Sequence, residues 1–147
     1  LLASKGLIED KSGYLKDRYN FPNPRVDVAG LVSKFASSCI DISDGLMQDA
    51  NHICIQSSVG MEIFVKDIPI SEHVRCFLHK DESCIDRVLS GGDDYELLFT
   101  SHDSDLSSYK EHKITKIGKV VSGTRVMFFD GFGKAIQCRK SGFKHFE

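Results

Sequence analysis

The stretch Cys39-Ile-Asp-Ile-Ser-Asp-Gly-Leu46 lies where an extended apolar segment gives way to a helical pattern. Residues 38–42 alternate well enough to predict a short buried strand. Residues 44–57 carry apolar side chains at helical spacing, which predicts a helix. The junction between the two segments gathers two carboxylates around Ser43, at the point where the predicted strand ends.

Two interpretations of this acidic junction are open. In the first, Ser43 or Asp44 caps the helix that begins near Gly45, because a short polar side chain accepts hydrogen bonds from the first backbone N–H groups of a helix. A cap leaves Asp41 unexplained, since a carboxylate in a buried strand is desolvated unless it meets a metal ion or a cation. In the second interpretation, the carboxylates bind Mg²⁺, which usually bridges to the phosphates of a nucleotide.

A second cluster is the run Leu89-Ser-Gly-Gly-Asp-Asp-Tyr-Glu-Leu97. Paired glycines allow the backbone to approach a ligand closely; the alternative is a tight turn before a strand predicted over residues 95–100. No Gly-Lys-Ser/Thr follows the glycines, which excludes a Walker A loop. The three acids Asp93, Asp94 and Glu96 are more than a turn requires, and they favour a binding role.

The third feature is the end of the sequence, Gly-Phe-Lys-His-Phe-Glu at residues 142–147. Two aromatic side chains and a histidine are unusual in a frayed terminus and suggest a docked tail. The plainer alternative is that Phe143 and Phe146 cover part of the core.

Composition narrows the class of protein. With 147 residues and 41% hydrophobic residues, the chain is long and apolar enough for one domain with a core. A net charge of -2 argues against a nucleic-acid partner. No apolar run approaches the roughly 20 residues needed to span a bilayer, so no membrane partner is expected. Five cysteines, odd in number and without C-x-x-C spacing, indicate reduced thiols and a cytoplasmic location.

Helices and strands alternate without a strict βαβ order, which predicts an α+β fold with a mixed β-sheet packed against helices. The other helices are predicted over residues 24–36, 72–79, 82–89 and 103–111, and the other strands over residues 61–65, 114–121, 125–130 and 135–138. Residues 1–20 are polar and lead into the turn Phe21-Pro-Asn-Pro24. We therefore expect residues 1–20 to be the tail of, or a linker from, a missing N-terminal domain, and residues 21–147 to form the domain itself.

The three clusters, in this order, resemble the C-terminal half of the thiamine-monophosphate kinase family, within the superfamily named for aminoimidazole-ribonucleotide synthetase. The resemblance runs from about Arg18 to the end of the chain. Its most specific pieces are Asp41-Ile-Ser-Asp-Gly-Leu46, the segment at residues 90–99 and Gly-Phe-x-His-Phe at residues 142–146. The supporting pieces are Pro-x-Pro-Arg at residues 22–25, Asp49-x-x-His52 and Asp67-Ile-Pro69.

The resemblance implies an ATP-dependent kinase that converts thiamine monophosphate to thiamine diphosphate. By position, Asp41 and Asp44 resemble Mg²⁺ ligands of the family, and Ser43 resembles a contact to ATP. Asp93 stands at a substrate-binding position that is often Glu, and the shorter side chain makes a bridging water an alternative to direct contact. Phe143 resembles an aromatic residue that packs on the thiamine ring.

The implied chemistry needs no general base. The acceptor is a phosphate monoester with a second pKa of about 6, so its oxygen is largely deprotonated near neutral pH. Catalysis then depends on positioning and on charge neutralisation by metal ions. The family's N-terminal domain is expected to supply the dimer contact, most metal ligands and most ATP contacts. We therefore expect a homodimer for the complete protein, and no turnover by this chain alone.

Two other functions compete with this one. The first is a different enzyme of the same superfamily, such as a purine-biosynthetic synthetase, a selenophosphate synthetase or a hydrogenase-maturation protein. The second is a noncatalytic binding or assembly module, because a fold by itself does not guarantee chemistry.

Overall fold

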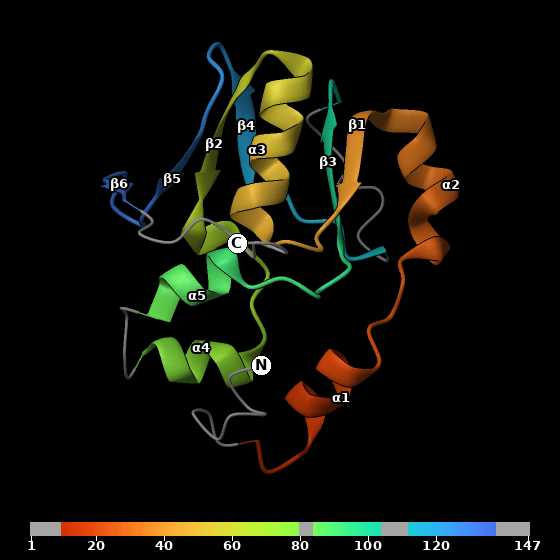
Figure 1. Ribbon diagram of the computed structural model, residues 1–147, viewed down its shortest axis with the longest axis vertical. Coiled ribbons are helices and arrows are strands. Elements are labelled where there is room, and N and C mark those ends of the chain that lie inside the picture. Colours follow the sequence, from red (N-terminus) through yellow and green to blue (C-terminus); the bar gives the residue numbers. More distant parts are fainter. Residues whose placement is uncertain (1–9, 80–83, 104–111, 138–147) are drawn as a thin grey trace, which may run out of the picture.

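The computed structural model describes residues 10–79, 84–103 and 112–137, and in these residues two β-sheets pack against one central helix, α3 (Figure 1). The helices are α1 (Tyr14–Asn20), α2 (Val26–Phe35), α3 (Leu46–Ser57), the 3₁₀ turn η1 (Val65–Asp67), α4 (Glu72–Leu78) and α5 (Ile85–Ser90). The strands are β1 (Ala36–Asp41), β2 (Gly60–Phe64), β3 (Leu97–Ser101), β4 (Gly118–Val121), β5 (Val126–Phe129) and β6 (Ala135–Ile136).

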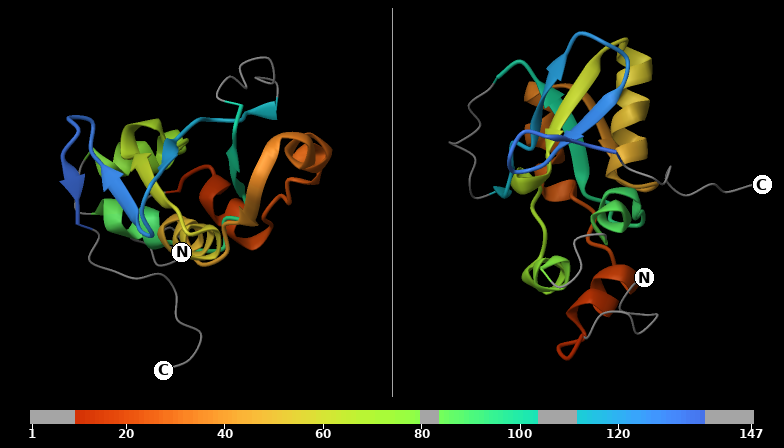
Figure 2. Two further views of the ribbon diagram at one scale, coloured as in Figure 1. Left: turned by 90° about the horizontal axis from the view of Figure 1, so that it is seen from above. Right: turned by 90° about the vertical axis from the view of Figure 1, so that its left-hand side faces the viewer.

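The larger sheet has the strand order β4-β2-β5-β6, and the smaller one pairs β1 with β3. Strand β2 runs antiparallel to β4 but parallel to β5, so the larger sheet is mixed. Strands β1 and β3 are antiparallel, with Asp41 opposite Leu97. The strands of both sheets curve around one side of α3 (Figure 2). This arrangement confirms the predicted α+β class with a mixed sheet.

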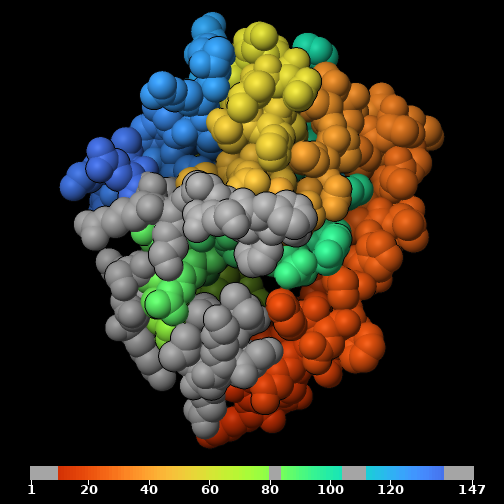
Figure 3. All heavy atoms as spheres, viewed as in Figure 1, coloured from red at the N-terminus to blue at the C-terminus, as the bar shows by residue number. Residues whose placement is uncertain are grey.

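The core forms where the apolar stripe of α3 meets the sheets. Helix α3 lies between β4 and β5 on one side and α2 and β1 on the other (Figure 3). Burying such a stripe supplies most of the stability of a helix of this length, because helices of about 12 residues are marginal alone in water. The buried cluster comprises Leu46, Ala50, Ile53, Cys54, Met61, Ile63, Leu89, Leu98 and Phe128.

Most predicted elements are present in the structure, with shifts of a few residues at their ends. The strand predicted over residues 95–100 begins two residues later, at Leu97, because the preceding backbone bonds to the turn after β1. The strand predicted from residue 114 begins only at Gly118. The predicted helix over residues 103–111 lies almost entirely outside the described residues, as does Cys138 at the end of the last predicted strand.

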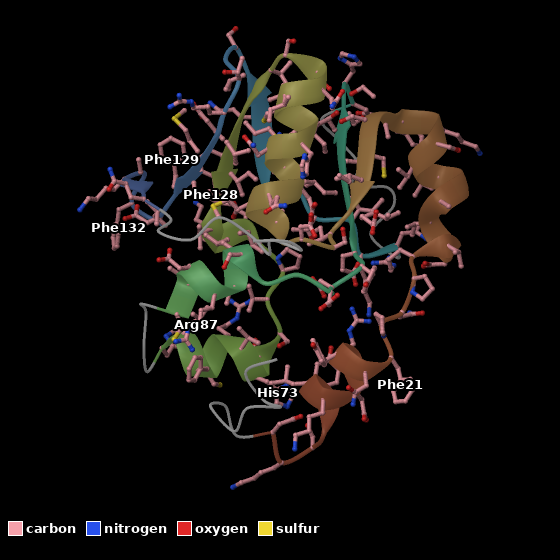
Figure 4. All side chains as sticks on the ribbon, in the orientation of Figure 1. Phe21, His73, Arg87, Phe128, Phe129 and Phe132 are labelled. Carbon is pink, nitrogen blue, oxygen red and sulfur yellow. The ribbon has the colours of Figure 1, made fainter. Side chains whose placement is uncertain are left out.

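Helix α1 was not predicted. None of its residues is buried, so it lacks the apolar stripe on which a sequence-based prediction depends. It is held by its neighbours instead: the rings of Tyr14 and His73 stack with centroids 5.3 Å apart. His73 lies on α4 where α4 faces α1 (Figure 4). Within residues 1–20, expected to be a tail or linker, the structure thus contains a helix that packs on the domain.

None of the helices within the described ranges combines the length and apolar character that crossing a bilayer requires.

Candidate functional site

The acidic junction and the glycine-rich segment meet in the structure through their backbones. The N–H of Asp93 donates to the carbonyl of Ser43 at 3.0 Å, and the N–H groups of Asp94 and Tyr95 donate to the carbonyl of Ile42 at 3.2 and 2.9 Å. The N–H of Ile42 in turn donates to the carbonyl of Glu96 at 2.8 Å. The two clusters that the sequence singled out therefore form one pair of loops, which we call the 42–45 turn and the 91–96 loop.

Two glycines allow these loops to approach. A Cβ atom on Gly92 would overlap the carbonyl oxygen of Ser43, and one on Gly45 would lie 2.7 Å from the carbonyl carbon of Ser90. Gly45 also has a φ of +109°, which favours glycine. Gly92 thus allows a close approach to the chain's own backbone, and the close approach to a ligand stays a prediction.

The helix-cap interpretation is wrong. The N-cap residue of α3 is Gly45, and no side chain at that position caps the helix. The carboxylate of Asp49, inside the first turn of α3, reaches back instead. Its Oδ2 accepts three backbone hydrogen bonds, from Ser43 at 3.0 Å and from Asp44 and Gly45 at 3.1 Å each.

Asp49 is the buried acid of this junction, and the sequence-based prediction did not include it among the site residues. Its side chain is 1% exposed, and it is the buried charged residue of the described core. Burial, and repulsion by Asp44, raise its pKa, although the three N–H donors favour the ionised form. A signal was present in the sequence: Asp49 lies three residues after Leu46 and four before Ile53, so it interrupts the apolar stripe of the helix.

Asp41 is exposed, so the expectation that it is a desolvated carboxylate in a buried strand is wrong. Burial alternates along β1, and Cys39 and Asp41 share the exposed face. Burial and the negative charge of Asp41 raise the pKa of the Cys39 thiol. The structure therefore leaves Asp41 available to solvent, and it is Asp49 that is desolvated at this junction.

Three side chains near the turn could hold a metal ion: Asp44, Asp49 and His52 each offer one ligand atom, and these atoms lie within 4.8 Å of one another. Asp44 also accepts a hydrogen bond from Gln48 Nε2 at 3.0 Å. Within the described residues, Asp41 belongs to no such group. Of the predicted ligand pair, only Asp44 belongs to a group of three such side chains among the described residues.

Asp93 lies on the exposed side of the 91–96 loop. It adopts a left-handed backbone conformation with a φ of +63°, as does Tyr95 with a φ of +57°. The Tyr95 hydroxyl donates a hydrogen bond to Asp93 Oδ1 at 3.2 Å. That bond and the charge of Asp93 raise the pKa of the Tyr95 hydroxyl, and burial and the charge of Asp41 add to the shift. Left-handed non-glycine residues gather at functional sites more than elsewhere.

Glu96 anchors the far end of the loop through two arginines. Its carboxylate lies 2.7 Å from Arg25 Nη1 and 3.2 Å from Arg18 Nη2. Arg25 also donates to the carbonyl of His112 at 2.9 Å, and its pKa is raised first by the hydrogen bond to Glu96. The third acid of the cluster, Asp94, lies 3.7 Å from Arg18. Glu96 therefore has a structural partner, whereas the predicted substrate residue Asp93 faces outward.

The remaining predicted site residue, Phe143, lies outside the described residues.

No family model matches the chain, but individual known proteins are similar to it. The chain is 35% identical over 147 residues to the thiamine-monophosphate kinase of Aquifex aeolicus, covering 99% of this chain and 46% of that protein. It also superposes on the solved structure of AaThiL complexed with AMPPCP and TMP, with a TM-score of 0.73 and 33% identity over 99% of this chain and 46% of that one.

The chain is a homologue of the thiamine-monophosphate kinases. It spans about half the length of the curated relatives that it matches.

A more distant likeness extends to Escherichia coli HypE, a hydrogenase maturation protein, with a TM-score of 0.56 and 14% identity over 83% of this chain and 42% of that one. At that identity the likeness concerns the fold alone. Between thiamine-monophosphate kinase and the hydrogenase-maturation protein, one of the sister enzymes considered above, the sequence identities therefore favour thiamine-monophosphate kinase.

Proposed function

We propose that this chain is part of an ATP-dependent thiamine-monophosphate kinase, which transfers the γ-phosphoryl group of ATP to thiamine monophosphate and releases thiamine diphosphate and ADP. The observation that carries the proposal is the 33% identity, across 99% of the chain, to AaThiL, which was solved with AMPPCP and TMP. The pairing of the 42–45 turn with the 91–96 loop supports it, because two of the three stretches most specific to the family share one site.

The turn fits a metal-nucleotide ligand. Asp44 offers carboxylate oxygens just before the start of α3. Asp41, the last residue of β1, offers an exposed carboxylate. Hard oxygen ligands suit Mg²⁺, which when bound neutralises charge on the phosphates. We assign Asp41 and Asp44 to Mg²⁺ and Ser43 to ATP. His52 is a poorer Mg²⁺ ligand, since nitrogen is softer than a carboxylate oxygen.

The loop fits the second substrate. Asp93 is exposed and tied to Tyr95, so the carboxylate is held at the surface of the loop. We assign Asp93 to thiamine monophosphate, directly or through a water, and Phe143 to stacking on the thiamine ring. The site has to bring two phosphate groups together in line, and the backbone bonds between the loops fix the distance between their binding residues.

The proposal extends to the complete protein. We expect an N-terminal domain that supplies further metal and ATP contacts, assembly as a homodimer, and a cytoplasmic location. The chain alone is expected to fold but to show no turnover, so thiamine diphosphate formed by purified residues 1–147 would contradict this assignment.

The test uses the complete protein with Mg-ATP and thiamine monophosphate and measures thiamine diphosphate directly. We expect product from the natural protein, and at least a hundredfold loss in Asp41→Asn or Asp44→Asn, as is typical when a charge-stabilising group is removed. Asp17→Asn is the matched control, because Asp17 is an exposed carboxylate on α1. A folded protein that forms no product would favour a sister enzyme or a noncatalytic module.

A further inference from the structure

We infer that Asp49 is a positioning residue that couples the 42–45 turn to the 91–96 loop, so that one buried carboxylate sets both halves of the site. The inference rests on the proposed function for its catalytic consequence, but the coupling itself is a property of the backbone. It concerns a residue that touches neither substrate in the assignment above.

The coupling passes through two peptide planes. In the plane that joins residues 42 and 43, the N–H of Ser43 donates to Asp49 while the carbonyl of Ile42 accepts from Asp94 and Tyr95. In the next plane, the N–H of Asp44 donates to Asp49 while the carbonyl of Ser43 accepts from Asp93. Because a peptide unit is rigid, rotating either plane breaks hydrogen bonds at both of its ends.

The burial of Asp49 makes these hydrogen bonds costly to break. Asp49 is almost wholly excluded from water, and its bond from the Gly45 N–H is buried, so water does not readily replace the carboxylate there; its bonds from Ser43 and Asp44 are part-buried. Its Oδ2 is occupied by three donors at 3.0–3.1 Å, which leaves that oxygen no room for a metal ion. The second oxygen of Asp49 takes no part in these three bonds, so a metal-ligand role within the group of Asp44, Asp49 and His52 is the alternative that the experiments below distinguish.

The first measurement is native-state hydrogen exchange on the unaltered complete protein, without substrates. If the coupling is correct, the amides of residues 43–45 and 93–95 exchange through one shared opening, with the same dependence on denaturant. The inference is overturned if residues 93–95 exchange like an open loop while residues 43–45 stay protected. This readout does not depend on kinase activity, so it stands even if the proposed function fails.

The second measurement uses Asp49→Asn, which keeps the shape but removes the charge that strengthens the three bonds. We expect exchange at both loops to accelerate about tenfold or more, since hydrogen bonds to a charged group are roughly twice as strong as neutral ones. If the kinase assignment also holds, KM for thiamine monophosphate rises although Asp49 lies across the turn from Asp93.

A metal-ligand role predicts a different pattern. In that case Asp49→Asn and His52→Asn would both raise the Mg²⁺ concentration for half-maximal rate, with hydrogen exchange in the 91–96 loop unchanged. That outcome would overturn the inference. The positioning role instead predicts a lower melting temperature and faster exchange in Asp49→Asn at any Mg²⁺ concentration, with Asp17→Asn as the carboxylate control.

Discussion

The two loops of the site are anchored by different physical means. The 42–45 turn is held by one buried carboxylate that accepts three backbone N–H groups, whereas the end of the 91–96 loop is held by Glu96, whose side chain is 36% exposed, through ion pairs to Arg18 and Arg25. Hydrogen bonds to a buried charge contribute about 1.5–3 kcal/mol each, and exposed ion pairs about 0.2–1 kcal/mol. The Asp49 anchor therefore fixes the backbone of its loop tightly. The Glu96 anchor holds its loop more weakly, and we call it the adjustable anchor.

The difference separates the assigned roles. The side that we assign to Mg-ATP has its backbone geometry fixed from within the core, at the start of α3. The side that we assign to thiamine monophosphate is the 91–96 loop. Its backbone is bonded to that turn, and Glu96 near its end is paired with Arg18 of α1 and with Arg25, the residue before α2. We expect changes in the first anchor to alter the whole site, and changes in the second to alter chiefly the loop that carries Asp93.

The largest effect is expected at the contact between the loops. Gly92→Ala places a Cβ atom into the carbonyl oxygen of Ser43, and neither backbone can move without losing the hydrogen bonds that join the loops. We predict at least a hundredfold loss of kinase activity in the complete protein and destabilisation by about 3 kcal/mol, as for other overpacked sites. Activity and the melting temperature measure it.

Gly30→Ala is the matched control for Gly92→Ala. Gly30 lies within α2, and a Cβ atom there meets nothing within 4 Å. Replacing glycine by alanine inside a helix stabilises it by about 0.5–1 kcal/mol, so the control should melt at or above the natural temperature. An equal loss in both variants, or full activity in Gly92→Ala, would contradict the proposed close contact.

The next effect distinguishes the two anchors directly. Asp49→Ala leaves the buried N–H of Gly45 and the part-buried N–H groups of Ser43 and Asp44 without this acceptor, and we predict destabilisation by about 3 kcal/mol. Glu96→Ala removes only the exposed anchor, for which we predict about 1 kcal/mol. Denaturant unfolding of the complete protein, followed by hydrogen exchange in each loop, measures both.

Salt sharpens this contrast. The ion pairs of Glu96 are partly solvated, so the effect of Glu96→Ala should shrink in about 1 M salt, where the screening length falls to about 3 Å. The effect of Asp49→Ala should change less with salt, because the Asp49 carboxylate is buried. Equal salt dependence for the two variants would show that the anchors do not differ in kind.

The sequence predicted the elements of the fold better than the details of the site. Period and turn signals located α2, α3, β2 and β5 because each buries one apolar face. Helix α1 escaped prediction since its contacts are made by Tyr14 and Arg18 and not by a buried stripe.

The acidic junction shows why the rest could not be predicted. Alternation along β1 marks two faces but does not say which is buried, so Asp41 was placed on the wrong one. Asp49 was noted only through the family resemblance, because an Asp inside a helix is ordinarily on a polar face. Its reach back to three N–H groups depends on the turn at Gly45, which is a tertiary feature formed against Ser90.

The smallest predicted effect concerns Asp94, in the adjustable half of the comparison. Burial and repulsion by Glu96 raise its pKa, and the more distant Arg18 opposes the shift only in part. A carboxyl whose pKa is higher in the folded than in the unfolded state favours folding while protonated, so its contribution is lost as pH rises through the folded-state pKa.

Asp94→Asn should therefore stabilise the complete protein slightly near pH 7, by no more than about 0.5 kcal/mol because the side chain is largely exposed. The gain should diminish as pH falls and the natural Asp94 takes up its proton. Melting temperatures of the two proteins between about pH 4 and pH 8 would measure it. A variant less stable than the natural protein at pH 7 would mean that the ion pair with Arg18 outweighs the repulsion by Glu96, and that Asp94 as well as Glu96 ties the loop to α1.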